Sequence, residues 1–473
     1  MKFVDLRKNS CKIQNLVDDF KVVIYIMINF LMKICRFNFG KFEEKEFRKF
    51  LRMGIIFMLT IGIYWSLRPL KDSLFSQLAG AINLPYAKTI SLIFMIPFVA
   101  LYTNLLDRFK KEKLLTVMPC VYGVVISLYA IFVWLFQKGA IQPSVITKMM
   151  GYVWYWFVES FGSVVVALFW SFSTDVTRSN SAKQGFPLVV ALGQIGGIIA
   201  PYLLINLPVA IGIRYDSVSM IILAVLTFLY APLIRNLLSK TPGELMNSGV
   251  ETKSKEKEKK EETGFMGGIK LLFTQKYLLG IFAVNLFFEF IVTIFDFNFK
   301  LLASTRYSGV ELTQYLSFYS SVVNTASLIC LLLGISKVAK KLGIGISLAV
   351  MPLLLGLAVF GFYTIHSLSF FLYLMVFSKA INYALNGPTL KQLYIPTSQD
   401  ARSKSQAWIE TFGSRISKEA GSGANMLIKP LGKSGYMLFS VLTSGIFIAA
   451  WFFIALFLGR TCKKATDSNN IVC

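Results

Sequence analysis

The chain has 473 residues, of which 55% are hydrophobic, with a mean hydropathy of +0.60 and a formal net charge of +24. This composition excludes an ordinary soluble globular domain. In a soluble protein so positive a charge would suggest a nucleic-acid partner. Here the Lys and Arg residues concentrate in alternate short loops between apolar runs, which is the pattern of positive-inside membrane topology. We therefore expect a lipid bilayer, and no nucleic acid, as the partner.

The first segment, residues 1–49, contains one apolar stretch, VVIYIMINFLMKIC at 22–35. It is too short to cross a bilayer comfortably, begins too late for a signal peptide, and is followed by no small-residue cleavage site. We interpret it as an interfacial helix or as sequence upstream of the true start.

Apolar runs long enough to span a bilayer then recur to the end of the chain, and about twelve can be counted. We therefore predict an all-α polytopic membrane protein of about twelve transmembrane helices. The runs lie near 50–78, 86–106, 113–136, 147–172, 183–206, 215–238, 272–303, 313–336, 343–364, 368–389, 405–428 and 434–459.

A charged stretch between the sixth and seventh runs divides the chain. Residues 239–264 have few large apolar residues and read as a solvated, disordered linker. Two six-helix halves with a site at their interface form a recurring transporter plan, and the loop LLDRFKKEK at 105–113 is similar to a major-facilitator signal. The predicted units are an N-terminal segment 1–49, a first half 50–238, a linker 239–270, a second half 271–459 and a tail 460–473.

The distribution of basic loops places both termini and the linker in the cytoplasm, as expected for a multi-pass protein of the cell inner membrane. The six cysteines are scattered and His366 is the only histidine. These residues suggest no disulfide framework, no metal site and no cofactor. We expect a monomer.

Charged residues inside four of the apolar runs are the strongest functional signal. An ionised group in hydrocarbon is costly, so such residues usually pair with one another or line a polar cavity. Basic residues on several spans indicate an anionic substrate. The charged residues are Arg68, Lys71 and Asp72 in the first run, Glu159 in the fourth, Glu289, Asp296 and Lys300 in the seventh, and Arg415, Lys418 and Glu419 in the eleventh.

Structural ion pairing is the alternative explanation of these charges. Arg415 with Glu419, and Arg68 with Asp72, have the i,i+4 spacing of helical ion pairs, as do Asp296 and Lys300. Lys71, Lys300 and Lys418 are harder to explain in this way, because the local carboxylates leave a positive surplus on the first and eleventh spans. A phosphate-bearing ligand would neutralise that surplus.

Four blocks resemble one known family in the right order. They are LRPLKDSLF at 67–75, the block 158–183 beginning VESFG, FDFNFK at 295–300, and the block 394–421 ending SRISKEAG. With these blocks the chain resembles the ATP/ADP translocases of obligate intracellular bacteria and plastids, the nucleotide transporter family. The resemblance implies a twelve-span, major-facilitator-like fold and exchange of ADP plus phosphate for ATP, or uptake of other nucleotides.

The family's important charged positions fall, by this resemblance, on Lys71, Glu159, Asp296 and Lys418. There are departures, because a family block with two lysines and an aspartate reads NYALNGPTL here, and a G-K-S-G-G core reads SKEAG, which places Glu419 beside Lys418. These departures favour a shifted substrate or coupling mode as the alternative to strict ATP/ADP exchange. The altered positions of the first block are Asn382, Gly387 and Leu390.

The sequence thus predicts a nucleotide transporter that works by alternating access, with ATP/ADP exchange as the leading function. Lys71, Lys300 and Lys418, with Arg68 and Arg415, would bind the phosphates, while Glu159 and Asp296 would hold those cations in the empty site. The alternatives are a proton-coupled importer of other nucleotides or organic anions and, from another class, a membrane-embedded transferase. An enzyme is not expected, since no G-x-x-x-x-G-K-[ST] loop is present and the charges lie within the spans rather than at one membrane face.

Overall fold

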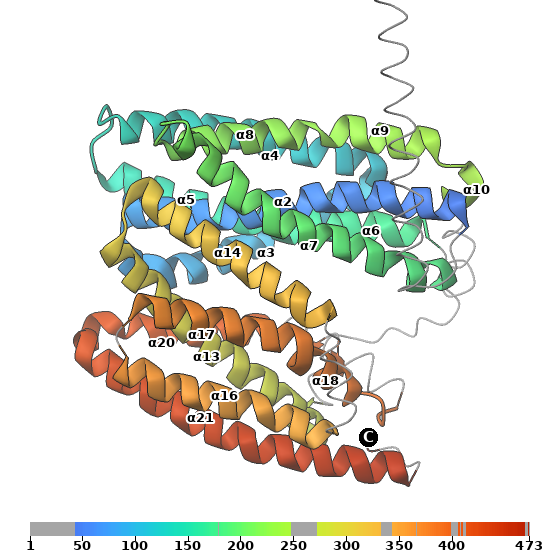
Figure 1. Ribbon diagram of the computed structural model, residues 1–473, viewed down its shortest axis with the longest axis vertical. Coiled ribbons are helices and arrows are strands. Elements are labelled where there is room, and N and C mark those ends of the chain that lie inside the picture. The colour runs from blue at the N-terminus through green and yellow to red at the C-terminus, as the bar shows by residue number, and fades with distance from the viewer. Residues whose placement is uncertain are drawn as a thin grey trace, which may run out of the picture.

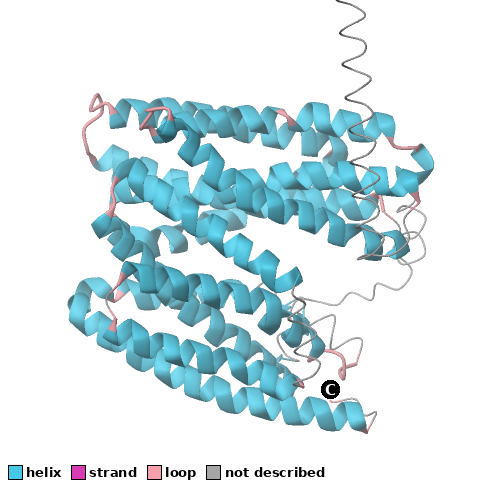
Figure 2. Cartoon of the chain, viewed as in Figure 1, coloured by secondary structure: helices cyan, strands magenta, loops and turns pink. Residues whose placement is uncertain are grey.

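The computed structural model describes residues 43–177, 179–246, 272–332, 343–365, 367–398, 405–406, 408–409, 413–468 and 472. All the regular secondary structure of these residues is helical (Figure 2). This follows from the medium, because hydrocarbon offers no partner for a backbone N–H or C=O and a helix satisfies these groups within the segment.

The N-terminal half is drawn in blue to green in Figure 1, and its helices run side by side. It contains α2 (Glu44–Ala79), η1 (Ala81–Asn83), α3 (Leu84–Arg108), α4 (Lys111–Gln137), α5 (Val145–Phe161), the π-helical turn η2 (Gly162–Val166), α6 (Ala167–Asp175), α7 (Ser179–Ala210), α8 (Asp216–Phe228), α9 (Tyr230–Lys240) and α10 (Gly243–Met246).

The C-terminal half, yellow to red in Figure 1, repeats the plan, with the long helix α21 along its outer side. It contains α13 (Lys276–Arg306), α14 (Gly309–Leu332), α16 (Ile344–Thr364), α17 (Leu368–Ile381), the π-helical turn η5 (Asn382–Asn386), α18 (Gly387–Gln392), α20 (Ser414–Met426) and α21 (Ile428–Asp467).

Nine helices within the described residues are long and apolar enough to cross a membrane. The predicted eighth, tenth and eleventh spans are also helical, as α14, as α17 with η5 and α18, and as α20. The tenth is interrupted by its π-helical turn, and the eighth and eleventh each adjoin or include residues outside the described ranges. The count of twelve therefore stays a prediction, whereas the polytopic all-helical class is confirmed.

Two of the predicted units lie largely outside the described residues. These are the N-terminal segment, including the apolar stretch 22–35, and most of the linker, since residues 1–42 and 247–271 are not described. At the other end, α21 continues to Asp467, so no helix end marks the predicted start of the tail at residue 460.

Each half has its own apolar core, and a third cluster joins the two. The joining cluster draws Phe75, Ala81 and Tyr155 from the first half and Phe297 and Tyr436 from the second. These residues lie near the helix ends away from the linker, because α10 ends and α13 begins at the opposite, linker end. We call this group, completed by Ala79, Leu84, Ala87 and Ile428, the far-end cluster.

Close packing of α2 on α7 depends on glycine. A Cβ built on Gly196 would lie 2.2 Å from the backbone oxygen of Met58, so only glycine permits this approach. A Cβ on Gly62 would in turn lie 3.4 Å from the oxygen of Gly196. The glycines of the fifth span thus serve helix packing, in the manner of small-residue interfaces in membranes, and they fix the position of α2.

Candidate substrate site

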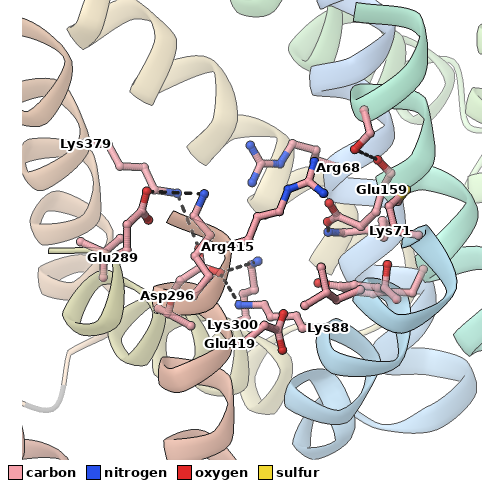
Figure 3. A pocket seen from close by; sticks show the side chains of 18 of the residues that line it. Arg68, Lys71, Lys88, Glu159, Glu289, Asp296, Lys300, Lys379, Arg415 and Glu419 are labelled. Carbon is pink, nitrogen blue, oxygen red and sulfur yellow. Dashed lines mark hydrogen bonds and ion pairs between the residues drawn. The ribbon is translucent and has the colours of Figure 1, made fainter. Parts of the chain in front are cut away.

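A cavity of about 490 Å³ lies between the two halves. Most of its lining consists of charged and aromatic side chains from both halves. The labelled charged side chains project toward one another in Figure 3. The lining residues are Tyr64, Trp65, Arg68, Lys71, Lys88, Ser91, Leu92, Met95, Tyr155, Glu159, Ser163, Phe288, Glu289, Val292, Thr293, Asp296, Lys300, Lys379, Asn382, Tyr383, Arg415, Lys418 and Glu419. All seven residues that the sequence proposed as substrate ligands are among them.

In the N-terminal half, Lys71 is held by three partners. Its ammonium forms an ion pair with Glu159 of α5, lies 3.6 Å from Oδ1 of Asp72, and sits 4.1 Å from the centre of the Tyr155 ring. Its side chain is only 2% exposed. A buried ammonium needs such compensation, which two carboxylates and a ring face together supply.

Arg68, one turn earlier on α2, lies against rings instead of a carboxylate. Its guanidinium carbon is 4.9 Å from the centre of the Trp65 ring and 5.6 Å from that of Tyr64. The alternative explanation, in which Arg68 pairs with Asp72, is not supported, since Asp72 faces Lys71 and Lys300. A guanidinium stacked on rings keeps its N–H donors available for an anionic ligand.

Lys300 joins the two halves. Its ammonium lies 2.6 Å from Oδ2 of Asp296, one turn away on α13, and 2.8 Å from Oδ2 of Asp72 on α2. The predicted i,i+4 pair of Asp296 with Lys300 is therefore present, and the bond to Asp72 crosses between the halves.

Sequence reasoning missed two lysines that contact Asp296. Lys88 on α3 lies 3.7 Å from Oδ2, and Lys379 on α17 lies 3.6 Å from Oδ1. The signal that identified the other charged residues applied to Lys379 as well, because it stands inside the tenth apolar run. Lys88 lies near the start of the second run, where a lysine resembles an interfacial residue.

The α20 side of the cavity is more open. The ammonium of Lys418 lies 3.5 Å from Oε1 of Glu289, which also accepts a hydrogen bond of 3.0 Å from the Ser414 hydroxyl. Arg415 lines the cavity with an exposed side chain. The alternative explanation, in which Arg415 pairs with Glu419, is not supported, because Glu419 accepts a 2.8 Å hydrogen bond from Thr89 of α3.

The family block that departs in this chain is only partly in the site. Asn382 lines the cavity and accepts a 2.8 Å hydrogen bond from the Asn386 amide, whereas Gly387 and Leu390 are not lining residues. Lys379, one turn before Asn382, brings a cation into this part of the site.

The cavity opens toward the linker end. Exposure of the lysine side chains falls with distance from the linker end of the helices. It is 53% for Lys418, 10% for Lys300 and 2% for Lys71. Beyond Lys71 and Lys300 the far-end cluster closes the space with apolar side chains of both halves. In Figure 1 the halves meet at the ends on the left and diverge on the right, where α10 and α18 lie. This is one of the two end states that alternating access requires.

Solved transporters share this architecture. A bacterial homologue of the iron transporter ferroportin superposes with a TM-score of 0.60 at 11% identity, covering 85% of this chain and 98% of that one. The nucleoside transporter NupG gives a TM-score of 0.59 at 16% identity over 86% and 98%. These likenesses show the fold, which is that of a multi-pass, major-facilitator-like membrane protein.

The sequence identifies the family within this class. The family model described as TLC ATP/ADP transporter matches residues 29–460, and the chain belongs to that family. A similar curated protein is ADP,ATP carrier protein 3 of Rickettsia bellii (strain RML369-C), 22% identical over 82% of this chain and 88% of that protein. Another is the chloroplastic ADP,ATP carrier protein 2 of Arabidopsis thaliana, 24% identical over 85% and 70%.

Proposed function

We propose that the protein exchanges ATP and ADP across its membrane by alternating access. Its relatives are named ADP,ATP carrier proteins, which supports this choice of substrates. The observation that carries the proposal is the charge of the cavity. Its described lining holds seven Lys and Arg residues and four Asp and Glu residues, at the interface of two halves that contact each other at one end. Such a surplus in a partly dehydrated site favours a polyanion such as a nucleotide over a neutral solute.

The carboxylates explain how the empty site is stabilised. Glu159 and Asp296 hold Lys71 and Lys300 until phosphate oxygens compete for the same ammonium groups. When a nucleotide takes over these contacts, the carboxylates are released and the ion pair of Lys300 with Asp72 weakens. Since that pair crosses between the halves, substrate binding is coupled to their separation at the far end.

The preference for exchange over net transport follows from the positive charge of the empty cavity. A carrier that returns empty must carry its surplus of positive charge through a closed state, without a counter-ion. Return with a nucleotide bound avoids this cost, so exchange is faster than net transport. Phosphate is a second candidate substrate of the same cations.

We further propose that the protein is a monomer of the inner membrane of a bacterial cell, with the linker end in the cytoplasm, so that the state described here faces inward. The basic loops support this orientation. No chemical step is needed for transport, and we propose a carrier without enzymatic activity.

Uptake into proteoliposomes tests the function. We expect labelled ATP to enter vesicles preloaded with ADP several-fold faster than empty vesicles, with no dependence on a pH gradient. Equal rates with and without internal ADP, together with stimulation by a pH gradient, would replace exchange by the proton-coupled alternative. A labelled panel of nucleotides would show whether the substrate has shifted from adenine nucleotides.

A further inference from the structure

Lys88 and Lys379 reach one carboxylate from opposite halves of the protein. Their ammonium groups lie 3.7 Å and 3.6 Å from the two oxygens of Asp296, while Lys300 lies 2.6 Å from Oδ2. One carboxylate thus faces three ammonium groups in the cavity. The other carboxylate that contacts Lys300, that of Asp72, also lies near Lys71.

The two outer distances leave donors available. A charge-assisted N–H···O bond is normally about 2.7–2.9 Å long, so Lys88 and Lys379 are near Asp296 without being bonded to it at full strength. Their side chains are 23% and 17% exposed, which leaves them accessible from the cavity. An additional anion placed between them would gain hydrogen bonds that Asp296 does not use.

Lys379 of the C-terminal half and Glu159 of the N-terminal half occupy equivalent positions, with opposite charges. Glu159 lies three residues before the π-helical turn η2, and Lys379 lies three residues before η5. Glu159 contacts Lys71 on the first helix of its half, and Lys379 contacts Asp296 on the first helix of the other. π-helical turns frequently occur at functional sites, and here each one follows, by three residues, a charged side chain that lines the cavity.

Three aromatic rings of the cavity lining lie at the other charge cluster, while the Tyr319 ring lies 5.1 Å from the Lys379 ammonium. Trp65 and Tyr64 flank Arg68, and Tyr155 covers Lys71. Rings of this kind can stack on a nucleobase. A nucleotide with its base near these rings would extend its phosphates toward Asp296.

We infer that Lys88 and Lys379 bind the phosphate groups beyond the first, one lysine from each half, and so set the preference for nucleoside di- and triphosphates over monophosphates. This inference rests on the proposed function. Each lysine supplies a charge-assisted hydrogen bond to a distal phosphate oxygen, and the two halves are bridged by the substrate at this point.

The test is nucleotide binding by the purified full-length protein in nanodiscs. Lys379→Gln and Lys88→Gln should each weaken ADP and ATP binding by about tenfold or more, the value of one charge-assisted hydrogen bond, and change AMP binding by less than about twofold. Lys379→Arg should retain most of the affinity. Lys391→Gln, an exposed residue of α18 outside the cavity lining, is the matched control and should bind like the wild type.

Equal losses of affinity for AMP, ADP and ATP would overturn the inference and leave the two lysines with a general electrostatic role. Unchanged affinities would also overturn it and leave the lysines only the role of neutralising Asp296. If Lys379→Gln does not fold, Lys379→Met, which keeps side-chain length without charge, and Lys88→Gln on the other half give the same comparison. Failure of the proposed function is distinguishable, because the wild type would then bind none of the three nucleotides.

Discussion

The ammonium of Lys300 lies 2.8 Å from Oδ2 of Asp72, so the first helix of the C-terminal half is tied to the first helix of the N-terminal half. This bond sits between the cavity and the far-end cluster. It therefore stabilises the state in which the far end is closed.

Loss of this bond should favour opening of the far end. We expect Asp72→Asn to raise the rate at which an impermeant maleimide labels Ala81→Cys, a far-end residue that is 7% exposed, by several-fold in a background without native cysteines. Lys300 keeps its bond to Asp296, so the protein should remain folded. Glu44→Gln, which removes an exposed ion pair with Arg48, is the control and should leave labelling unchanged.

Asp296 and Lys300 should be energetically coupled, but removing both should not restore full stability. Asp296→Asn leaves three ammonium groups facing each other, which should cost roughly 3–5 kcal/mol. In the double variant with Lys300→Gln, Lys88 and Lys379 still lack the carboxylate that they contact in the wild type. Thermal unfolding of the four proteins in a double-mutant cycle measures the coupling; strictly additive losses would show that the pair does not interact.

Lys71 and Lys418 should respond differently to substitution. Lys71→Gln removes a partner of buried Asp72 and of Glu159, so both transport and thermal stability should fall. Lys418→Gln removes a half-exposed ammonium, so transport should fall while the free energy of unfolding changes by about 1 kcal/mol or less. Nucleotide uptake and melting temperature, measured at matched expression, test this difference between the two variants. Normal uptake by Lys418→Gln would show that Lys418 does not bind substrate.

Gly196→Ala should destabilise the contact of α2 with α7 by about 1–3 kcal/mol. The added Cβ would lie 2.2 Å from the Met58 backbone oxygen, and backbone cannot rotate away as a side chain can. Gly423→Ala, where no atom lies within 4 Å of the new Cβ, is the matched control and should be neutral or stabilising in helix α20. Comparable melting temperatures for both variants would contradict the close approach of the two helices.

The helical class and the main charged residues could be predicted from sequence because both leave a local signal. A lysine in an apolar run, such as Lys71 or Lys300, stands out without any knowledge of its neighbours. Partners were harder to predict. The i,i+4 spacing agrees with the observed pair of Asp296 and Lys300. The same spacing of Arg68 and Asp72 corresponds to no such pair, because a tertiary contact from α13 takes that carboxylate.

The dependence on tertiary contacts also explains why Lys88 was not predicted as a site residue. Its distance to Asp296 depends on how α3 crosses α13 between the halves, and a single sequence carries no local trace of that crossing. The π-helical turns η2 and η5 could not be predicted from the sequence either.

The far-end cluster also has an electrical consequence. A transmembrane voltage falls mainly across the least conducting part of its path, and in this state that part is the apolar layer formed by residues such as Phe75 and Phe297. The cavity charges then share the electrical potential of the linker side, and switching to the other state carries them through most of the field. Moving one elementary charge across the membrane changes the free energy by about 2.3 kcal/mol for each 100 mV. The switching equilibrium of the empty, positively charged carrier therefore depends strongly on voltage, whereas a bound polyanion cancels much of that charge. The resting membrane voltage would thus set the direction in which empty carriers accumulate.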